Sequence, residues 1–227
     1  MLSPIAGMAA DVVNFLDPNR KISYAQEGED LVLSRLAEGR KAGFYIDVGA
    51  HDPLRFSNTF LFYKRGWRGL NIEPSTTAID RFQRKRARDI NVNLGVGETS
   101  GALTYYIFND PALNTFDKTL MQEREAHTSY RVIQTTKVGV ERLERILDQH
   151  LPDGQEIDFM SIDVEGFDLQ VLRSNDWIRF RPEFVLVEAL DFSMDDANKH
   201  PVHEFMIGVG YKLVAKTMNT LFYQELR

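Results

Sequence analysis

Short apolar stretches alternate with longer amphipathic segments along most of this chain. The short stretches are typical of buried strands, and the amphipathic segments have the spacing of helices with one apolar face. This alternation predicts a mainly parallel sheet covered by helices, because each parallel pair of strands needs a crossover connection. At 227 residues, the chain has the length of one domain. We therefore predict a single α/β domain.

The expected elements follow from this pattern. Strands are predicted at 44–48, 68–72, 90–94, 157–162 and 184–187, with two more near 211–215 and 220–224. Helices are predicted at 25–37, 58–64, 76–87, 140–147 and 201–207, and another begins at 169–172. Two further extended stretches, 101–108 and 132–138, enclose a polar segment at 109–130. That segment is long for a simple loop, so we expect it to cover a site or to contain a short helix, with Asn114, His127 and Tyr130 as candidate contacts to a bound substrate.

Composition excludes several classes of protein. The chain has 27 Lys and Arg against 33 Asp and Glu, a net charge of −6, which disfavours a nucleic-acid partner. It has no Cys, which excludes disulfides, Cys-ligated zinc, iron–sulfur clusters and thiol nucleophiles. It also has no apolar run of the roughly 20 residues that span a bilayer. Residues 1–15 are read as an ordinary helix and not as a signal peptide, so residues 1–22 are expected to form a helical extension, 23–227 the main domain, and the location is expected to be the cytoplasm.

Four acidic residues fall at or near the carboxyl ends of predicted strands: Asp47, Glu73, Asp163 and Glu188. In open α/β sheets, ligands bind at this edge. Any one of the four acids has an ordinary alternative explanation as a helix cap. Four at the same edge favour a ligand site.

The stretch around Asp47 narrows the class of ligand. A strand leads into Gly49, where the backbone can approach a ligand closely. The surrounding residues match neither the G-x-G-x-x-G fingerprint of dinucleotide sites nor the P-loop pattern. Glu73 lies at the end of the next strand, where a carboxylate can accept both hydroxyls of a ribose. The pair suggests an adenosine-containing ligand without a pyrophosphate.

Together these motifs resemble class I S-adenosylmethionine-dependent methyltransferases, and more narrowly the FkbM family of O-methyltransferases. The resemblance covers about residues 23–188 and rests on YAQEGED at 24–30, FYIDVGAHDP at 44–53, SNT at 57–59, GWRG at 66–69, NIEP at 71–74 and IDFMSIDVEG at 157–166. One departure is Ala25, where related chains usually have Ser, and it leaves the cofactor assignment intact. The resemblance implies a Rossmann-like seven-stranded sheet with a reversed last hairpin, S-adenosylmethionine as methyl donor, and a hydroxyl acceptor on a small glycan, nucleotide sugar or related metabolite.

The resemblance also implies roles for single residues. Asp47 and Gly49 are expected beside the methionine part of the cofactor, Glu73 at the ribose and Asn93 near the adenine. Gln26 and Asn58 are expected at the methionyl amine or carboxylate, and Asp163 is also expected beside the cofactor.

Methyl transfer to an alcohol needs alignment of donor and acceptor and removal of one proton. The candidates for that proton are His51, Asp163 and Glu165, with hydrogen bonding, helix capping and simple solvation as their alternative explanations. Asp163 and Glu188 end strands that are expected to be neighbours, so they are also candidate ligands for Mg²⁺ or Mn²⁺. His203 is a further candidate for the site.

Other features have structural explanations. The basic run Arg81, Arg84, Lys85, Arg86 and Arg88 is expected to lie on a solvated helix face, with Ile79 and Phe82 turned inward. Trp67 and Trp177 are expected to pack in the interior.

Two other functions stay open at this point. One is an NAD(P)-dependent Rossmann oxidoreductase or epimerase, which the missing G-x-G-x-x-G and the lack of a Tyr-x-x-x-Lys pair after the fourth strand disfavour. The other is a non-catalytic module that binds an adenosine ligand, and the acids at all four strand ends argue against it.

Overall fold

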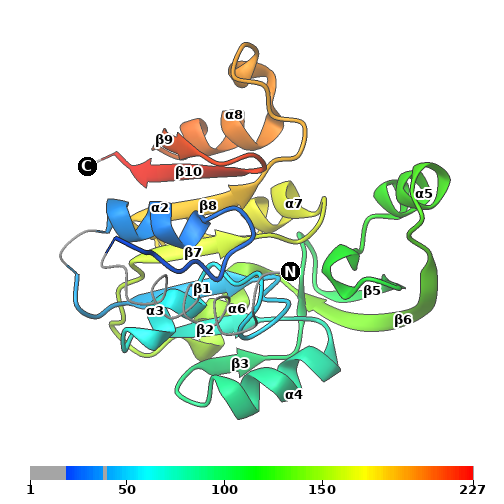
Figure 1. The fold of residues 1–227 in the computed structure, drawn as a ribbon, viewed down its shortest axis with the longest axis horizontal. Helices are drawn as coiled ribbons and strands as arrows, with labels where there is room; N and C mark the ends of the chain where they lie inside the picture. Colours follow the sequence, from blue (N-terminus) through cyan, green and yellow to red (C-terminus); the bar gives the residue numbers. More distant parts are fainter. Residues whose placement is uncertain (1–18, 38–39, 227) are drawn as a thin grey trace, which may run out of the picture.

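A computed structural model describes residues 19–37 and 40–226, and the predicted extension at 1–22 falls mostly outside this part. A seven-stranded sheet in the order β3-β2-β1-β7-β8-β10-β9 forms the centre of the molecule (Figure 1). Strand β10 is antiparallel to both of its neighbours, and the other pairings are parallel. The strands are β1 (Phe44–Val48), β2 (Arg68–Ile72), β3 (Ile90–Val92), β7 (Phe159–Ile162), β8 (Phe184–Glu188), β9 (Tyr211–Lys216) and β10 (Thr220–Glu225). The predicted α/β fold with its reversed C-terminal hairpin is confirmed.

Helices cover both faces of this sheet because successive strand residues point to opposite sides. Ile46 belongs to the larger apolar core, which also holds Leu147 of α6 and Met206 of α8. Its neighbour Tyr45 belongs to a second core on the other face, with Leu33 of α2. The helices of the domain are α2 (Glu29–Leu36), α3 (Phe60–Lys64), α4 (Thr76–Lys85), α6 (Leu143–His150), α7 (Asp168–Arg173) and α8 (Pro201–Gly208), with a short 3₁₀ helix η2 (Ala197–Lys199) before α8.

Two helices begin later in the chain than predicted. The helix expected at 25–37 begins only at Glu29, since Gly28 before it has the left-handed backbone angle φ 87°. The helix expected at 140–147 is Leu143–His150, because the strand before it, β6, continues to Glu141. In both places the boundary is set by the preceding backbone and not by helical spacing of apolar residues.

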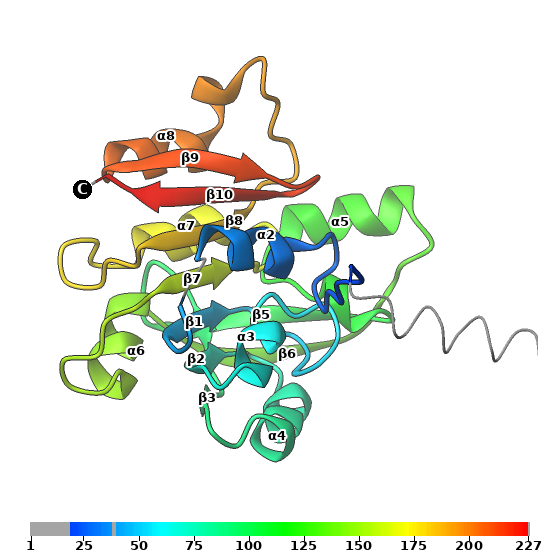
Figure 2. The ribbon, with the colours of Figure 1, turned by 60° about the vertical axis from the view of Figure 1, so that its left-hand side comes forward.

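A second, smaller sheet in the order β4-β6-β5 lies beside the main one. It consists of β4 (Gly95–Val96), β5 (Gly101–Phe108) and β6 (Val132–Glu141). The connection between β5 and β6 contains a 3₁₀ helix, η1 (Pro111–Leu113), and a helix, α5 (Lys118–His127). Figures 1 and 2 show α5 at the end of the β5–β6 hairpin. The prediction that segment 109–130 contains a short helix is confirmed. In the described part of the chain, every helix is too short or too polar to serve as a membrane span.

Candidate functional site

Strand register brings the predicted acids to one edge of the sheet. Val48 lies level with Ile72 of β2 and with Ile162 of β7, and Ile162 lies level with Val187 of β8. The next residue of each strand therefore lies at the same carboxyl edge; these residues are Gly49, Glu73, Asp163 and Glu188. All four line one cavity of about 370 Å³. The predicted position of the site at this edge follows from the parallel pairing alone.

The loop after β1 turns sharply to leave room for this cavity. Gly49 has φ 77°, and a Cβ at this position would lie 1.9 Å from the carbonyl oxygen of Asp163, so only glycine fits. His51 also has a left-handed backbone, with φ 52°. Its backbone N–H donates to Glu73 Oε2 at 2.9 Å. The turn thus connects the end of β1 directly to the carboxylate at the end of β2.

Glu73 is fixed in place by backbone donors. Its side chain lies in the cavity wall and is 4% exposed. Oε2 accepts from His51 and Oε1 accepts from the N–H of Ser75 at 2.8 Å, which leaves a second lone pair on each oxygen for a ligand. Burial raises the pKa of this carboxyl to about 7. The carboxylate therefore suits a ligand that donates two hydroxyl hydrogen bonds, as a ribose does, and the apolar side chains of Leu94, Val96 and Ala78 line the cavity beside it.

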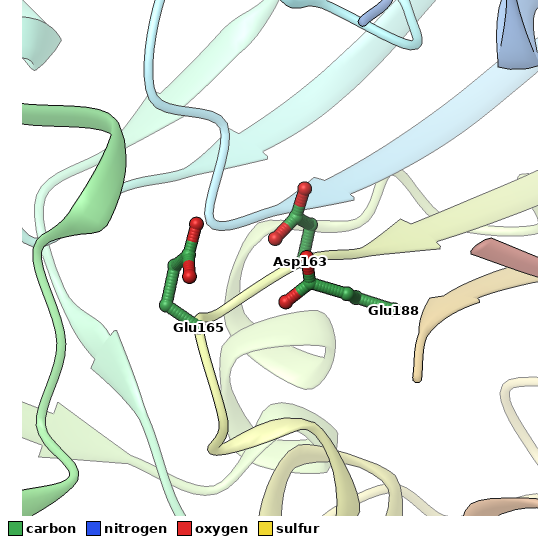
Figure 3. Close-up of side chains that lie close together, drawn as sticks. All are labelled: Asp163, Glu165 and Glu188. Carbon is green, nitrogen blue, oxygen red and sulfur yellow. The ribbon is translucent and has the colours of Figure 1, made fainter. Parts of the chain in front are cut away.

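Three carboxylates that line the same cavity lie close together, Asp163, Glu165 and Glu188 (Figure 3). One oxygen of each lies within 4.8 Å of the others. Oε2 of Glu188 is buried and, within the described residues, has no hydrogen-bond partner. Burial and mutual repulsion raise the pKa of Asp163 and of Glu188, so this cluster retains protons that exposed carboxyls would release. His51 is absent from the cluster, and burial lowers its pKa, so its ring is neutral at pH 7.

The two predicted amide contacts also line the cavity. Gln26 lies in the turn before α2, and Asn58 lies just before α3. Nδ2 of Asn58 donates to the hydroxyl of Ser161 at 3.0 Å, which fixes the side chain against β7. The structure thus brings Gln26, Asn58, Gly49 and Glu73 to one cavity, while their contacts with a cofactor stay predictions.

Asp47 and Asn93 are not among the described residues that line the cavity. Asp47 lies one position before the strand end, so it points to the opposite face from Val48. It accepts a hydrogen bond from the hydroxyl of Thr59 at 2.6 Å, and burial raises its pKa to about 6. Nδ2 of Asn93 donates to the carbonyl oxygen of Glu73 at 2.9 Å. In this structure both side chains support the walls of the site from behind.

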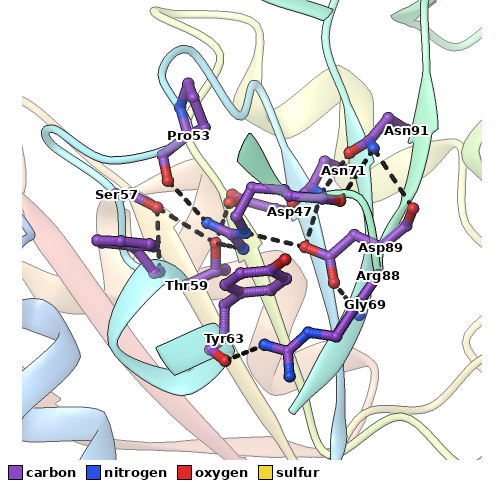
Figure 4. A network of polar contacts seen from close by, with 12 residues as sticks. Asp47, Pro53, Ser57, Thr59, Tyr63, Gly69, Asn71, Arg88, Asp89 and Asn91 are labelled. Carbon is purple, nitrogen blue, oxygen red and sulfur yellow. Dashed lines mark hydrogen bonds and ion pairs between the residues drawn. The ribbon is translucent and has the colours of Figure 1, made fainter. Parts of the chain in front are cut away.

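Arg86 corrects the prediction for the basic run. Ile79 and Phe82 of α4 are buried, as predicted, but Arg86 is also fully buried. It lies just after the end of α4 and turns inward, where it forms an ion pair with Asp89 at 2.9 Å. It also donates to the hydroxyls of Tyr45 and Thr59. Thr59 in turn donates to Asp47, and Figure 4 shows the polar network that contains Asp47, Thr59 and Asp89. Helical spacing could not reveal this, because the residue is no longer in the helix.

We expect Arg86→Met to reduce the free energy of unfolding by about 3–5 kcal/mol, since it leaves Asp89 buried without its cation. Urea denaturation would measure this loss. Arg84→Met removes an exposed cation from the last turn of the same helix and should change the free energy by less than about 0.5 kcal/mol. Equal effects of the two substitutions would contradict the role assigned to Arg86.

Three other sequence predictions concern residues away from the cavity. Trp67 and Trp177 are buried and packed, as predicted. His203 is a buried residue of α8, with Nδ1 3.1 Å from the hydroxyl of Tyr223, and is not among the described residues that line the cavity. Sequence reasoning missed Arg124 of α5, which forms an ion pair with Glu165. The only sequence signal for it was the length of the polar segment 109–130.

The strand order, the reversed β10 and the cavity at the carboxyl edge define a Rossmann-like domain of the class I methyltransferase type. The sequence profile of the FkbM methyltransferase domain matches residues 47–213. The chain belongs to this family of S-adenosylmethionine-dependent methyltransferases.

Two solved structures are similar to the chain. A TehB-like SAM-dependent methyltransferase from Corynebacterium glutamicum is 10% identical, with 97% of each chain covered and a TM-score of 0.44. An O-methyltransferase from Bacillus cereus, solved in complex with SAH, is 13% identical, with 98% of this chain and 89% of that chain covered and a TM-score of 0.36. No curated protein matches the chain.

Proposed function

We propose that this methyltransferase transfers a methyl group to a hydroxyl of a small glycan, a nucleotide sugar or a related metabolite. One observation carries the proposal: a buried carboxylate suited to a ribose and a cluster of three carboxylates lie in the same cavity. The first suits a nucleoside, and the second suits an acceptor that must lose a proton. S-adenosylmethionine, when bound, supplies a methyl group that its sulfonium has already activated.

The residues around Glu73 would hold the cofactor. Glu73 would accept the two ribose hydroxyls, and Leu94 and Val96, which line the same cavity, would contact the adenine. Gly49, Gln26 and Asn58, which also line it, would hold the methionine part. Asp47 and Asn93, expected at the methionine part and the adenine, act in this proposal through the walls that they support.

Asp163 is the first candidate for the general base. It lines the cavity beside Glu165 and Glu188, and its raised pKa makes its ionised form a stronger base than an ordinary carboxylate. Glu165 is the second candidate, although its ion pair with Arg124 uses one of its oxygens. His51 is neutral and lines the cavity, so it is the third.

The same cluster offers ligands for Mg²⁺ or Mn²⁺. Asp163 and Glu188 supply the hard oxygen donors that these ions prefer, and Glu165 stands beside them. A bound cation would also offset the mutual repulsion of the carboxylates and lower the pKa of an acceptor hydroxyl. We include a divalent cation in the proposal on this donor chemistry.

The proposal is tested by incubating the purified protein with methyl-labelled S-adenosylmethionine and a panel of methyl glycosides and nucleotide sugars. Simple amines and carboxylic acids serve as controls. We expect label on hydroxyl oxygens, and a large loss of transfer after exhaustive chelation that Mg²⁺ or Mn²⁺ restores.

Each other result removes one part of the proposal. Label on amines alone would contradict O-methylation. Cofactor binding without transfer across the whole panel would favour the non-catalytic module. Transfer unchanged by chelation would remove the metal. Binding of NAD⁺ in place of S-adenosylhomocysteine would return attention to the oxidoreductase alternative, which the family match opposes.

A further inference from the structure

The η1–α5 segment (residues 109–131) forms a wall of the cavity although it belongs to no part of the main sheet. Pro111, Ala112, Asn114 and Phe116 line the cavity. They approach it on the side where Glu165 stands, since the hydroxyl of Thr115 donates to the Glu165 carbonyl oxygen at 2.7 Å. This wall therefore borders the carboxylate cluster, which is the reacting end of the cavity in the proposed function.

Hydrophobic packing holds only part of this segment: Phe116 packs against Tyr105 and Phe167, whereas α5 has no fully buried residue. All ten residues of α5 are described, and none of them is buried. Between residues 109 and 130, all of which are described, only Thr115 is buried. Elements with few buried apolar contacts open at low cost, and lids and binding segments are drawn from them. Beyond the packing of Leu120 against Gly166, the position of α5 therefore depends on its polar contacts.

Those contacts converge on Arg124 and Glu165. Nη2 of Arg124 forms an ion pair with the Glu165 carboxylate, and Nη1 donates to the carbonyl oxygen of Leu113 at 2.9 Å. The two side chains are only 12% and 18% exposed. One guanidinium thus joins α5, η1 and the loop after β7. Because Glu165 stands in the carboxylate cluster, removal of the guanidinium would also leave its carboxylate without a cation beside the acidic groups of Asp163 and Glu188.

We propose that Arg124 is a positioning residue that docks the η1–α5 segment over the reacting end of the cavity and so fixes the wall that meets the acceptor. The acceptor part of this inference rests on the proposed function, and the docking part does not. A lysine cannot replace the arginine fully, since it lacks the planar fork that reaches two acceptors at once.

Hydrogen exchange followed by mass spectrometry tests the docking. The variants are Arg124→Met, Arg124→Lys and Glu165→Gln, with Arg131→Met as the matched control. Arg131 lies in the same segment, and its guanidinium contacts only the nearby carbonyls of Thr128 and Tyr130 among the described residues. We expect exchange across residues 118–127 to become at least about tenfold faster in Arg124→Met, to rise less in Arg124→Lys, and to stay unchanged in Arg131→Met.

The Glu165→Gln variant identifies the contact responsible. It should also speed exchange in α5, and the double variant should show less than the product of the two single effects. The strands of the main sheet should keep wild-type exchange, and the affinity for S-adenosylhomocysteine should stay within about twofold in Arg124→Met.

The docking proposal is overturned if α5 exchanges at the wild-type rate in Arg124→Met. It is equally overturned if faster exchange spreads through the main sheet, since Arg124 would then be a general determinant of stability. Failure of the wild-type protein to bind S-adenosylhomocysteine would instead contradict the proposed function, and the exchange result would still decide the docking.

Discussion

Replacing Glu73 with alanine is expected to weaken the binding of S-adenosylhomocysteine by about 10- to 100-fold or more. A hydrogen bond to a charged group contributes about 1.5–3 kcal/mol, and about 1.4 kcal/mol corresponds to a tenfold change in affinity. Glu73 is held at the cavity wall by two backbone N–H groups, so its carboxylate needs no rearrangement to accept ribose hydroxyls. Calorimetric titration of the wild-type and Glu73→Ala proteins measures the difference.

Two comparisons make this result specific. Glu98→Ala removes an exposed carboxylate outside the cavity lining and should leave the affinity unchanged. Titration with NAD⁺ should give no binding to either protein. Equal affinity of wild type and Glu73→Ala for S-adenosylhomocysteine would place the ribose elsewhere, and binding of NAD⁺ alone would require the contacts around Gly49 to be reassigned.

The pH dependence of this binding has a defined sign. Burial raises the pKa of Glu73 to about 7, and the ribose hydroxyls must donate to the ionised form. Affinity should therefore fall as the pH falls below about 7, by up to tenfold per pH unit. The Glu73→Ala variant should show a flatter profile. The free energy of unfolding should change with pH in the opposite direction. Because the pKa of Glu73 is raised, the folded protein binds this proton at a higher pH than the unfolded chain does, so the contribution of Glu73 to stability increases as the pH falls.

A site residue could be predicted from the sequence where the pairing of parallel strands alone sets its position. Glu73, Asp163 and Glu188 were predicted at one edge because parallel strands bring their carboxyl ends together whatever the details of packing. Asp47 is one residue short of that edge, and a shift of one residue along a strand reverses the face to which a side chain points.

Arg86 and Arg124 mark the limit of sequence reasoning here. Arg86 pairs with Asp89 because the chain turns inward after α4 ends. Arg124 pairs with Glu165 because the long connection between β5 and β6 folds back over the sheet edge. Neither position is set by local periodicity. The sequence could indicate that segment 109–130 covers a site, but only the folded chain reveals that Arg124 of this segment pairs with Glu165.

Replacing Asp163 with asparagine is expected to lower methyl transfer by about 10²–10⁴-fold, the usual contribution of a general base. The affinity for S-adenosylhomocysteine should stay within about tenfold, because Glu73 and its backbone donors are untouched. Labelled methyl transfer to the best acceptor of the hydroxyl panel, and calorimetry, measure the two effects. Full transfer by Asp163→Asn would remove Asp163 from the mechanism and leave Glu165 and His51 as candidates.

Asp163→Asn should also change the free energy of unfolding. This change can be measured without knowing the acceptor. Burial and the neighbouring carboxyls raise the pKa of Asp163, so the folded protein holds a proton that the unfolded chain releases. Its contribution to stability is therefore present below its ordinary pKa and declines as the pH rises. Asp163→Asn has no carboxyl group to titrate, so urea denaturation at pH 5 and pH 8 should show a smaller decline in the free energy of unfolding for the variant, which should be more stable than wild type at pH 8. A catalytic carboxylate kept at the expense of stability would give this combination of lower transfer and higher stability, whereas a helix-capping Asp163 would give normal transfer and lower stability.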